Sequence, residues 1–148
     1  FGTVLGYPSC TAFLNQVSGH SRMSAWRRRA LEAFPSLRAE ISAANSTLYS
    51  LFFELVPICV AAHKTSDKES LKRIYGFAVW CSRQPERELW NAAGVAFFEK
   101  LAQHRNITDQ LPDWVPKDVF ENVSSLLEDA IGADALDSIR SRYNSSAR

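Results

Sequence analysis

The chain has 148 residues, of which 46% are apolar and 22% charged, and its formal net charge is +1. This length predicts one domain, and the composition excludes a disordered chain, a collagen-like fibre and a disulfide-dense miniprotein. The near-neutral charge gives no reason to expect nucleic-acid binding. The longest apolar stretch, residues 48–62, is interrupted by polar residues and is too short to span a membrane. We therefore expect no membrane insertion.

The first 22 residues differ from the rest of the chain. They contain three glycines, one proline and no acidic residue. No positively charged start precedes a sustained apolar run, so the segment matches a signal peptide poorly. The only methionine is Met23, immediately before the first predicted helix. We predict that residues 1–22 are an N-terminal extension, either upstream of or added to the natural chain, and that residues 23–148 form a single helical domain.

The first half of this domain is predicted to be helical. Ser24 is placed to cap a first helix, which Pro35 ends, and a shorter helix follows over residues 36–44. A third helix, residues 46–63, is apolar on nearly every face, which indicates a buried central helix. Pro57 lies inside it and removes one backbone donor, so a kink is expected there.

The next two helices are separated by a single proline. A capping box at Ser66–Glu69 opens a helix that ends at Gln84. Pro85 then starts a fifth helix, which continues to His104. Small residues surround Gly94 in this fifth helix, and they predict the close approach of a neighbouring helix because a glycine in a helix interior otherwise costs about 1 kcal/mol.

The last third of the chain begins with a predicted linker that holds Trp114 between two prolines. An amphipathic helix over residues 117–131 follows, Gly132 ends it, and a final helix covers about residues 134–143. The tail, residues 144–148, is expected to fray. The short connections predict antiparallel neighbours. The sequence therefore predicts an all-α fold, a compact antiparallel bundle of about six helices, with stacked helix pairs as an alternative.

Glu54 is the most unusual charged residue, because it is the only one in the apolar stretch 48–62. Burial of a carboxylate without a partner costs several kcal/mol, so we expect Glu54 to be paired, protonated or facing a cavity. Arg73, Trp90 and Asn91 are the candidate partners. One interpretation is a buried polar latch that fixes helix register. The other is a pocket in which Glu54 acts as a catalytic acid or anchors a ligand.

Neither the cysteines nor the histidines predict a site. The three cysteines form no CxxC pair and suit a reducing compartment. The three histidines match no metal-binding motif, and His63 and His104 fall at predicted helix ends, where their charge would favour the last carbonyls. No phosphate-binding loop or nucleophile elbow occurs. We expect no metal, no cofactor, no catalytic residue and no enzymatic activity.

Charge is distributed unevenly along the chain. Residues 1–46 have five basic and two acidic side chains, a net charge of +3, whereas residues 106–148 have four and eight, a net charge of −4. The acidic third could attract a basic protein partner. Trp114 is an aromatic anchor candidate there, with a cap on the helical core as the alternative role. The predicted partner-binding residues are Trp114, Asp109, Asp113, Asp118, Glu121 and Asp129.

Three stretches resemble a known family: LFFELVP (51–57), RIYGFAVWC (73–81) and ELWNAAGVAFFE (88–99). The family consists of small bacterial proteins that share a domain of unknown function, and the resemblance covers about residues 25–145. It implies a bacterial, cytoplasmic, all-helical protein, and it supplies no catalytic residues. Small helical proteins of this kind are also loosely similar to immunity proteins, which neutralise a cognate toxin.

Together these features favour a non-enzymatic protein–protein interaction module, with an immunity protein that binds a toxin domain as its most specific form. The alternative is a small-molecule-binding or enzymatic helical bundle with its pocket around Glu54. A structural homo-oligomer is a third possibility, and it would need an exposed apolar helix face.

Overall fold

The computed structural model describes residues 23–146, so the extension predicted for residues 1–22 and the last two residues lie outside the described part. Residues 23–146 are helical and contain no strand, which confirms the all-α fold class. The elements are α2 (Ala25–Ala33), η2 (Pro35–Leu37), α3 (Arg38–Ser42), α4 (Leu48–Thr65), α5 (Lys68–Ser82), α6 (Arg87–Ala92), η3 (Ala93–Phe98), α7 (Glu99–Leu101), α8 (Arg105–Thr108), α9 (Leu111–Trp114), α10 (Lys117–Ile131) and α11 (Ala133–Ser146).

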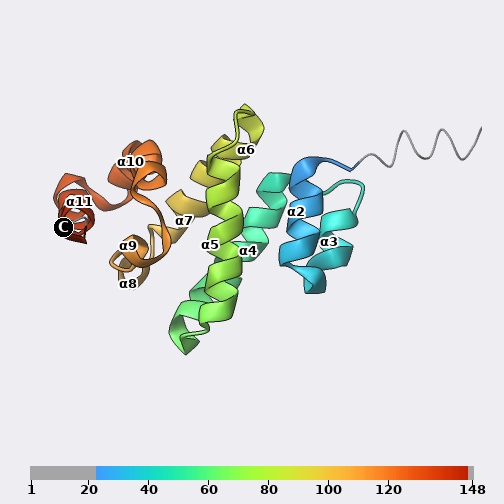
Figure 1. Cartoon of the computed structure of the whole chain (residues 1–148), viewed down its shortest axis with the longest axis horizontal. Coiled ribbons are helices and arrows are strands. Elements are labelled where there is room, and N and C mark those ends of the chain that lie inside the picture. Colours follow the sequence, from blue (N-terminus) through green and yellow to red (C-terminus); the bar gives the residue numbers. More distant parts are fainter. Residues whose placement is uncertain (1–22, 147–148) are drawn as a thin grey trace, which may run out of the picture.

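The helices form a bundle with α4 and α5 at its middle (Figure 1). The pair α2 and α3 lies at one end of the molecule, and α8 to α11 lie at the other. The continuous helix made by α6, η3 and α7 packs against both α4 and α5. One cluster of buried apolar side chains extends from Trp26 in α2 to Tyr143 in α11, so both ends share a single core. The predicted helical bundle is confirmed.

The connection between α4 and α5 is fixed by local hydrogen bonds. Thr47 and Ser50 form a capping box at the start of α4, with Thr47 Oγ1 accepting from the Ser50 N–H at 3.0 Å. At the other end, Ser66 adopts a left-handed conformation with φ of 55° and ends α4. Asp67, whose carboxylate accepts from the Ser70 N–H at 3.2 Å, caps α5. The sequence placed this cap one residue too early, at Ser66.

The first helix is held by an arginine rather than by a cap. The Ser24 side chain, predicted to cap α2, makes no capping hydrogen bond, and its buried Oγ has no partner among the described residues. Arg27 instead reaches across to the end of α3. Its Nε donates to the Ile41 carbonyl at 3.2 Å and its Nη2 to the Ser46 carbonyl at 2.6 Å. One member of the arginine cluster therefore has a structural role.

The fifth predicted helix contains a π-helical segment. It begins at Arg87, two residues later than predicted, and widens into a π-helix over η3 (Ala93–Phe98) before it narrows again in α7. Gly94 is buried in this segment, and a Cβ there would lie 2.8 Å from Leu126 Cδ1 of α10. The small residues around Gly94 therefore do mark a close helix contact, and α10 is the neighbour.

The predicted linker before α10 is itself helical in two short turns, α8 and α9. Tyr143 of α11 secures this region, because its hydroxyl lies 3.2 Å from the Leu111 carbonyl and 2.7 Å from the Val115 carbonyl. Helix α11 continues to Ser146, so residues 144–146 belong to a helix rather than to the frayed tail that we expected.

Candidate functional site

Helix α4 exposes an apolar face to solvent. Phe53 is 54% exposed and Ile58 is 39% exposed, and they are two of the three large exposed apolar side chains among residues 23–145. Pro57 and Ala61 are also exposed, one helical turn along. We define the α4 face as Phe53, Pro57, Ile58 and Ala61. The opposite side of the same helix is buried in the core, so α4 presents apolar residues both to the core and to solvent.

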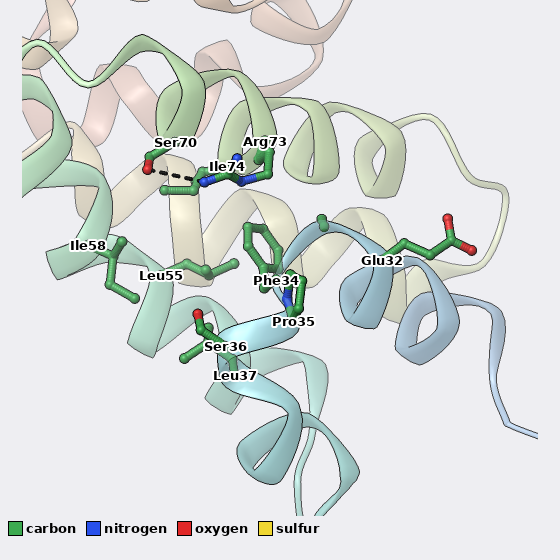
Figure 2. A pocket seen from close by; sticks show the side chains of 11 residues that line it. Glu32, Phe34, Pro35, Ser36, Leu37, Leu55, Ile58, Ser70, Arg73 and Ile74 are labelled. Atoms are coloured by element: carbon green, nitrogen blue, oxygen red, sulfur yellow. Dashed lines mark hydrogen bonds between the residues drawn. The ribbon is translucent and has the colours of Figure 1, made fainter.

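A groove of about 540 Å³ borders the α4 face on the side of α2 (Figure 2). Leu55 and Ile58 of α4 form one wall, and Phe34 and Ile74 contribute from α2's C-terminal end and from α5. Figure 2 shows Arg73 over the groove with its guanidinium directed at Ser70. We refer to this as the α2–α4 groove.

Arg73 has only weak partners within the chain. Its Nη2 lies 3.4 Å from Ser70 Oγ, and its Nη1 lies 3.8 Å from the Glu69 carboxylate. Both members of that ion pair are exposed, and exposed pairs contribute little to stability because water screens them. Glu32, which also lines the groove, points away from the other labelled side chains (Figure 2). The Arg73 guanidinium can therefore pair with an anion brought by a ligand.

A second groove, of about 300 Å³, borders the other side of the α4 face. Val56 and Val60 supply apolar surface, Lys64 lies at its end, and His104 contributes from the segment after α7. Pro57 and Ala61 belong both to this groove and to the α4 face. The α4 face is thus a ridge with an apolar depression on each side, which is the relief that another helix can pack against.

Glu54 lies on this exposed ridge and not in the core. Its side chain is exposed, and among the described residues it takes part in no printed hydrogen bond or ion pair. The expectation of a buried Glu54, as a latch or at the base of a pocket, is therefore wrong. The physical reason is that α4 is apolar on all sides without being buried on all sides. A single carboxylate in an exposed apolar helix face pays no desolvation cost.

The proposed partners of Glu54 lie in separate places. Arg73 lines the α2–α4 groove, whereas Trp90 and Asn91 line a groove between α6 and α10. Asn91 donates from Nδ2 to the Tyr49 hydroxyl at 2.8 Å, and Trp90 is 43% exposed. The four residues of the predicted pocket do not converge on one site.

Two of the five acidic candidates are already paired. Asp118 binds Arg83 through two hydrogen bonds, of 2.8 and 3.1 Å, and Glu121 binds Arg140 with its shortest contact at 3.0 Å. These hydrogen bonds from arginine lower the pKa of both carboxyl groups below the ordinary values. The other three acidic candidates, Asp109, Asp113 and Asp129, are exposed.

Trp114 caps the core. Its side chain is half-buried and stacks on Tyr75, with ring centroids 5.8 Å apart and an interplanar angle of 14°. Of the two roles considered for Trp114, this geometry favours the structural one. An indole engaged on one face leaves less surface for a partner than the exposed Phe53 does.

Beneath Trp114 lies a buried polar network that the sequence did not reveal. His63 is only 8% exposed, and it links three helices: its Nε2 lies 2.7 Å from the Tyr75 hydroxyl and its Nδ1 lies 3.2 Å from Gln110 Oε1. Because Gln110 Oε1 can only accept, Nδ1 carries the proton and Tyr75 donates to Nε2. Burial lowers the pKa of His63. The expected role of His63 at an exposed helix end is wrong, since its ring turns into the core.

The thiols of this core are unreactive. Cys59 and Cys81 are free and buried, and burial raises the pKa of each to about 12. A thiol of that pKa is protonated at neutral pH and is a weak nucleophile. Within residues 23–146, no three histidine, cysteine or acidic side chains come together in a group that could hold a metal ion.

The comparisons with known proteins identify a family. A family described as a domain of unknown function, DUF7674, matches residues 27–130, and the chain belongs to it. No curated protein and no solved structure matches the chain. Among the described residues, none of the helices combines the length and apolar character that crossing a membrane requires.

Proposed function

We propose that this member of the DUF7674 family is a non-enzymatic protein-binding module whose docking surface is the α4 face. In its most specific form, the proposal is an immunity protein of the bacterial cytoplasm that neutralises a toxin domain. The observation that carries the proposal is the exposure of Phe53 and Ile58 on a helix whose other side forms the core.

An exposed apolar ridge of this kind is costly for a chain that acts alone. Burial of one large apolar side chain is worth about 1.5–3 kcal/mol, and the α4 face leaves this free energy unused at Phe53 and largely unused at Ile58. Contiguous exposed apolar residues are typical of protein interaction sites. Binding energy in such sites is concentrated in a few central residues, a role for which Phe53 and Ile58 are placed.

The charges around the ridge specify the chemistry of the partner. Glu54 lies within the α4 face, and Arg73 lies beside it, over the α2–α4 groove. A complementary partner would present an apolar helix face with a basic group opposite Glu54 and a carboxylate opposite Arg73. The exposed acids Asp109, Asp113 and Asp129 would steer a basic partner during encounter without forming the centre of the interface.

The alternative, a small-molecule-binding or enzymatic pocket around Glu54, has less support. An exposed carboxylate has no enclosed environment in which burial or a like charge could tune it for proton transfer. The immunity-type proposal is supported by the small helical scaffold and by the resemblance of the three stretches named above, and its bacterial and cytoplasmic setting comes from the same resemblance.

The experiment is an affinity purification of the tagged full chain from its native lysate, compared with the double variant Phe53→Ser/Ile58→Ser. The matched control is Trp90→Ser, which removes the third exposed large apolar side chain from a different groove. Circular dichroism and thermal unfolding check that all three chains are folded. We expect one stoichiometric partner with the wild type and the control, and its loss with the double variant.

A partner that the double variant still captures at wild-type yield would contradict the α4 face as the docking surface. The absence of any stoichiometric partner would contradict the interaction module under those conditions. A partner that carries a toxin-like domain, with growth restored by coexpression of the wild type and not of the double variant, would support the immunity proposal. Light scattering tests the homo-oligomer: a dimer that the double variant converts to a monomer would mean that a second copy covers the face.

A further inference from the structure

A third groove, between α6 and α10, has a chemistry unlike that of the α4 face. Its volume is about 500 Å³, within the range of small-molecule sites. It is lined by uncharged residues from α5, α6, η3 and α10. The polar ones are two amides, Asn91 and Asn122, and two hydroxyls, Ser82 and Ser125.

Trp90 forms one wall of this groove and is 43% exposed. Aromatic side chains bury large areas in most folds, so an indole with this exposure keeps much of its ring surface available. The same flat ring also carries an N–H donor, which has no hydrogen-bond partner among the described residues. Trp90 therefore offers a stacking surface with one polar edge.

The polar groups of the groove retain free hydrogen-bonding capacity. Asn91 uses one amide hydrogen on the Tyr49 hydroxyl, which leaves its second amide hydrogen and its carbonyl oxygen. The side chains of Asn122 and Ser125 are exposed and have no side-chain hydrogen bonds within residues 23–146. Ser82 Oγ, in the same lining, is buried without a partner, which is rare for a buried polar atom.

The backbone below these side chains is the π-helix η3. Gly94 lies in the lining, and the absence of a Cβ lets Leu126 of α10 pack onto it. A π-helical segment is less favourable than a regular α-helix, and such segments occur frequently at functional sites. This is an observation independent of the side-chain chemistry, and it falls on the same groove.

We propose that the α6–α10 groove binds a neutral carbohydrate, of the size of a disaccharide. The apolar C–H face of a sugar ring stacks on Trp90, and the ring hydroxyls exchange hydrogen bonds with Asn91 and Asn122. The lining has no cation that could hold a phosphate or a carboxylate, and no anion that could hold an amine. Its amides and hydroxyls would lose their water without compensation on an entirely apolar ligand.

The experiment is a titration of the ¹⁵N-labelled full chain followed by NMR, which observes the indole N–H of Trp90 and the side-chain amides of Asn91 and Asn122 directly. The probes are maltose, cellobiose and N,N′-diacetylchitobiose, with adenosine as a neutral ligand that stacks but lacks a disaccharide's hydroxyl pattern. We expect at least one disaccharide to shift these three signals together, with saturation at or below about 20 mM, a weak but specific affinity.

Two variants locate the binding. Trp90→Ala removes the stacking surface, and we expect it to weaken the affinity by about tenfold or more, a change that corresponds to about 1.4 kcal/mol. Phe53→Ala is the matched control, since it removes an exposed aromatic ring from the α4 face, and it should leave the affinity unchanged. Both residues are exposed, and thermal unfolding verifies that each variant folds.

Three results would overturn the proposal: no disaccharide shifts the three signals, adenosine shifts them and the sugars do not, or the affinity survives Trp90→Ala. The proposal does not depend on the docking role of the α4 face. Failure of the affinity purification would leave the titration unaffected, and the reverse also holds.

Discussion

The hydroxyl of Tyr75 offers a direct test of the buried network around His63. The variant Tyr75→Phe keeps the ring, and with it the stacking on Trp114 and the edge contact with Phe97, whose centroids lie 5.8 Å from that of Tyr75 in both cases. Only the hydroxyl that lies 2.7 Å from His63 Nε2 is removed. His63 is 8% exposed, so water has little access to replace the lost donor.

The expected cost follows from that burial. A buried acceptor that loses its donor costs about 1–3 kcal/mol, whereas the net loss of an exposed hydrogen bond is smaller. For a domain of this size, each kcal/mol corresponds to a fall of about 2–4 °C in Tm. The matched control is Tyr49→Phe, which removes a hydroxyl bonded to Asn91 at 2.8 Å on a half-buried side chain. We expect this control to cost about 0.5 kcal/mol, because water can reach the Asn91 amide.

The assay is equilibrium unfolding in urea at pH 7.5, with the m-value as a check that the unfolding transition is unchanged. A Tyr75→Phe variant within about 0.5 kcal/mol of the wild type, or no more destabilised than Tyr49→Phe, would refute the assigned network. It would mean that His63 Nε2 is satisfied in another way, and the linkage of α4 to α5 through this pair would have to be abandoned.

Three further predictions concern stability. Burial lowers the pKa of His63, so the unfolded chain binds its proton more readily: stability is full above about pH 6.5, falls as the pH drops below that value and levels off beneath the folded pKa, and His63→Gln should flatten this fall in urea titrations across pH. Thr47→Ala removes the cap of α4 and should cost about 1 kcal/mol in chemical denaturation, and a cost near zero would contradict the capping box. Phe97→Ala should cost about 3–5 kcal/mol because Phe97 is fully buried, whereas Phe53→Ala should stay within about 0.5 kcal/mol; similar costs in thermal unfolding would contradict the assigned burial.

The helices could be predicted from the sequence because local patterns determine them. The amphipathic stripe of α10 and the stop at Gly132 lie within one segment, and the structure has α10 over Lys117–Ile131 as predicted. The close contact at Gly94 was also visible, since a glycine among small residues in a helix needs a packing reason. The π-helical geometry was not, because no residue type distinguishes it from a regular α-helix.

The candidate site was mostly beyond prediction, because it depends on which face of α4 the other helices leave uncovered. An apolar helix face that meets solvent and one that meets the core have the same residue pattern, and Glu54 was misjudged for that reason. The partners of His63, 12 and 47 residues away in the sequence, are brought to it only by the fold. The pairing of Asp118 with Arg83, which removes one acidic candidate, likewise joins α10 to the end of α5.

The π-helix η3 also makes the register of the chain sensitive to a single residue. A π-helical turn contains an extra residue relative to the α-helix that it interrupts. Deleting one residue between Ala93 and Phe98 would restore a regular helix, and it would rotate everything after that point by about 100° and shift it by about 1.5 Å. Leu101 would then leave its place in the core. An unbroken count of residues across this segment is therefore a simple criterion for whether another chain can build the same groove.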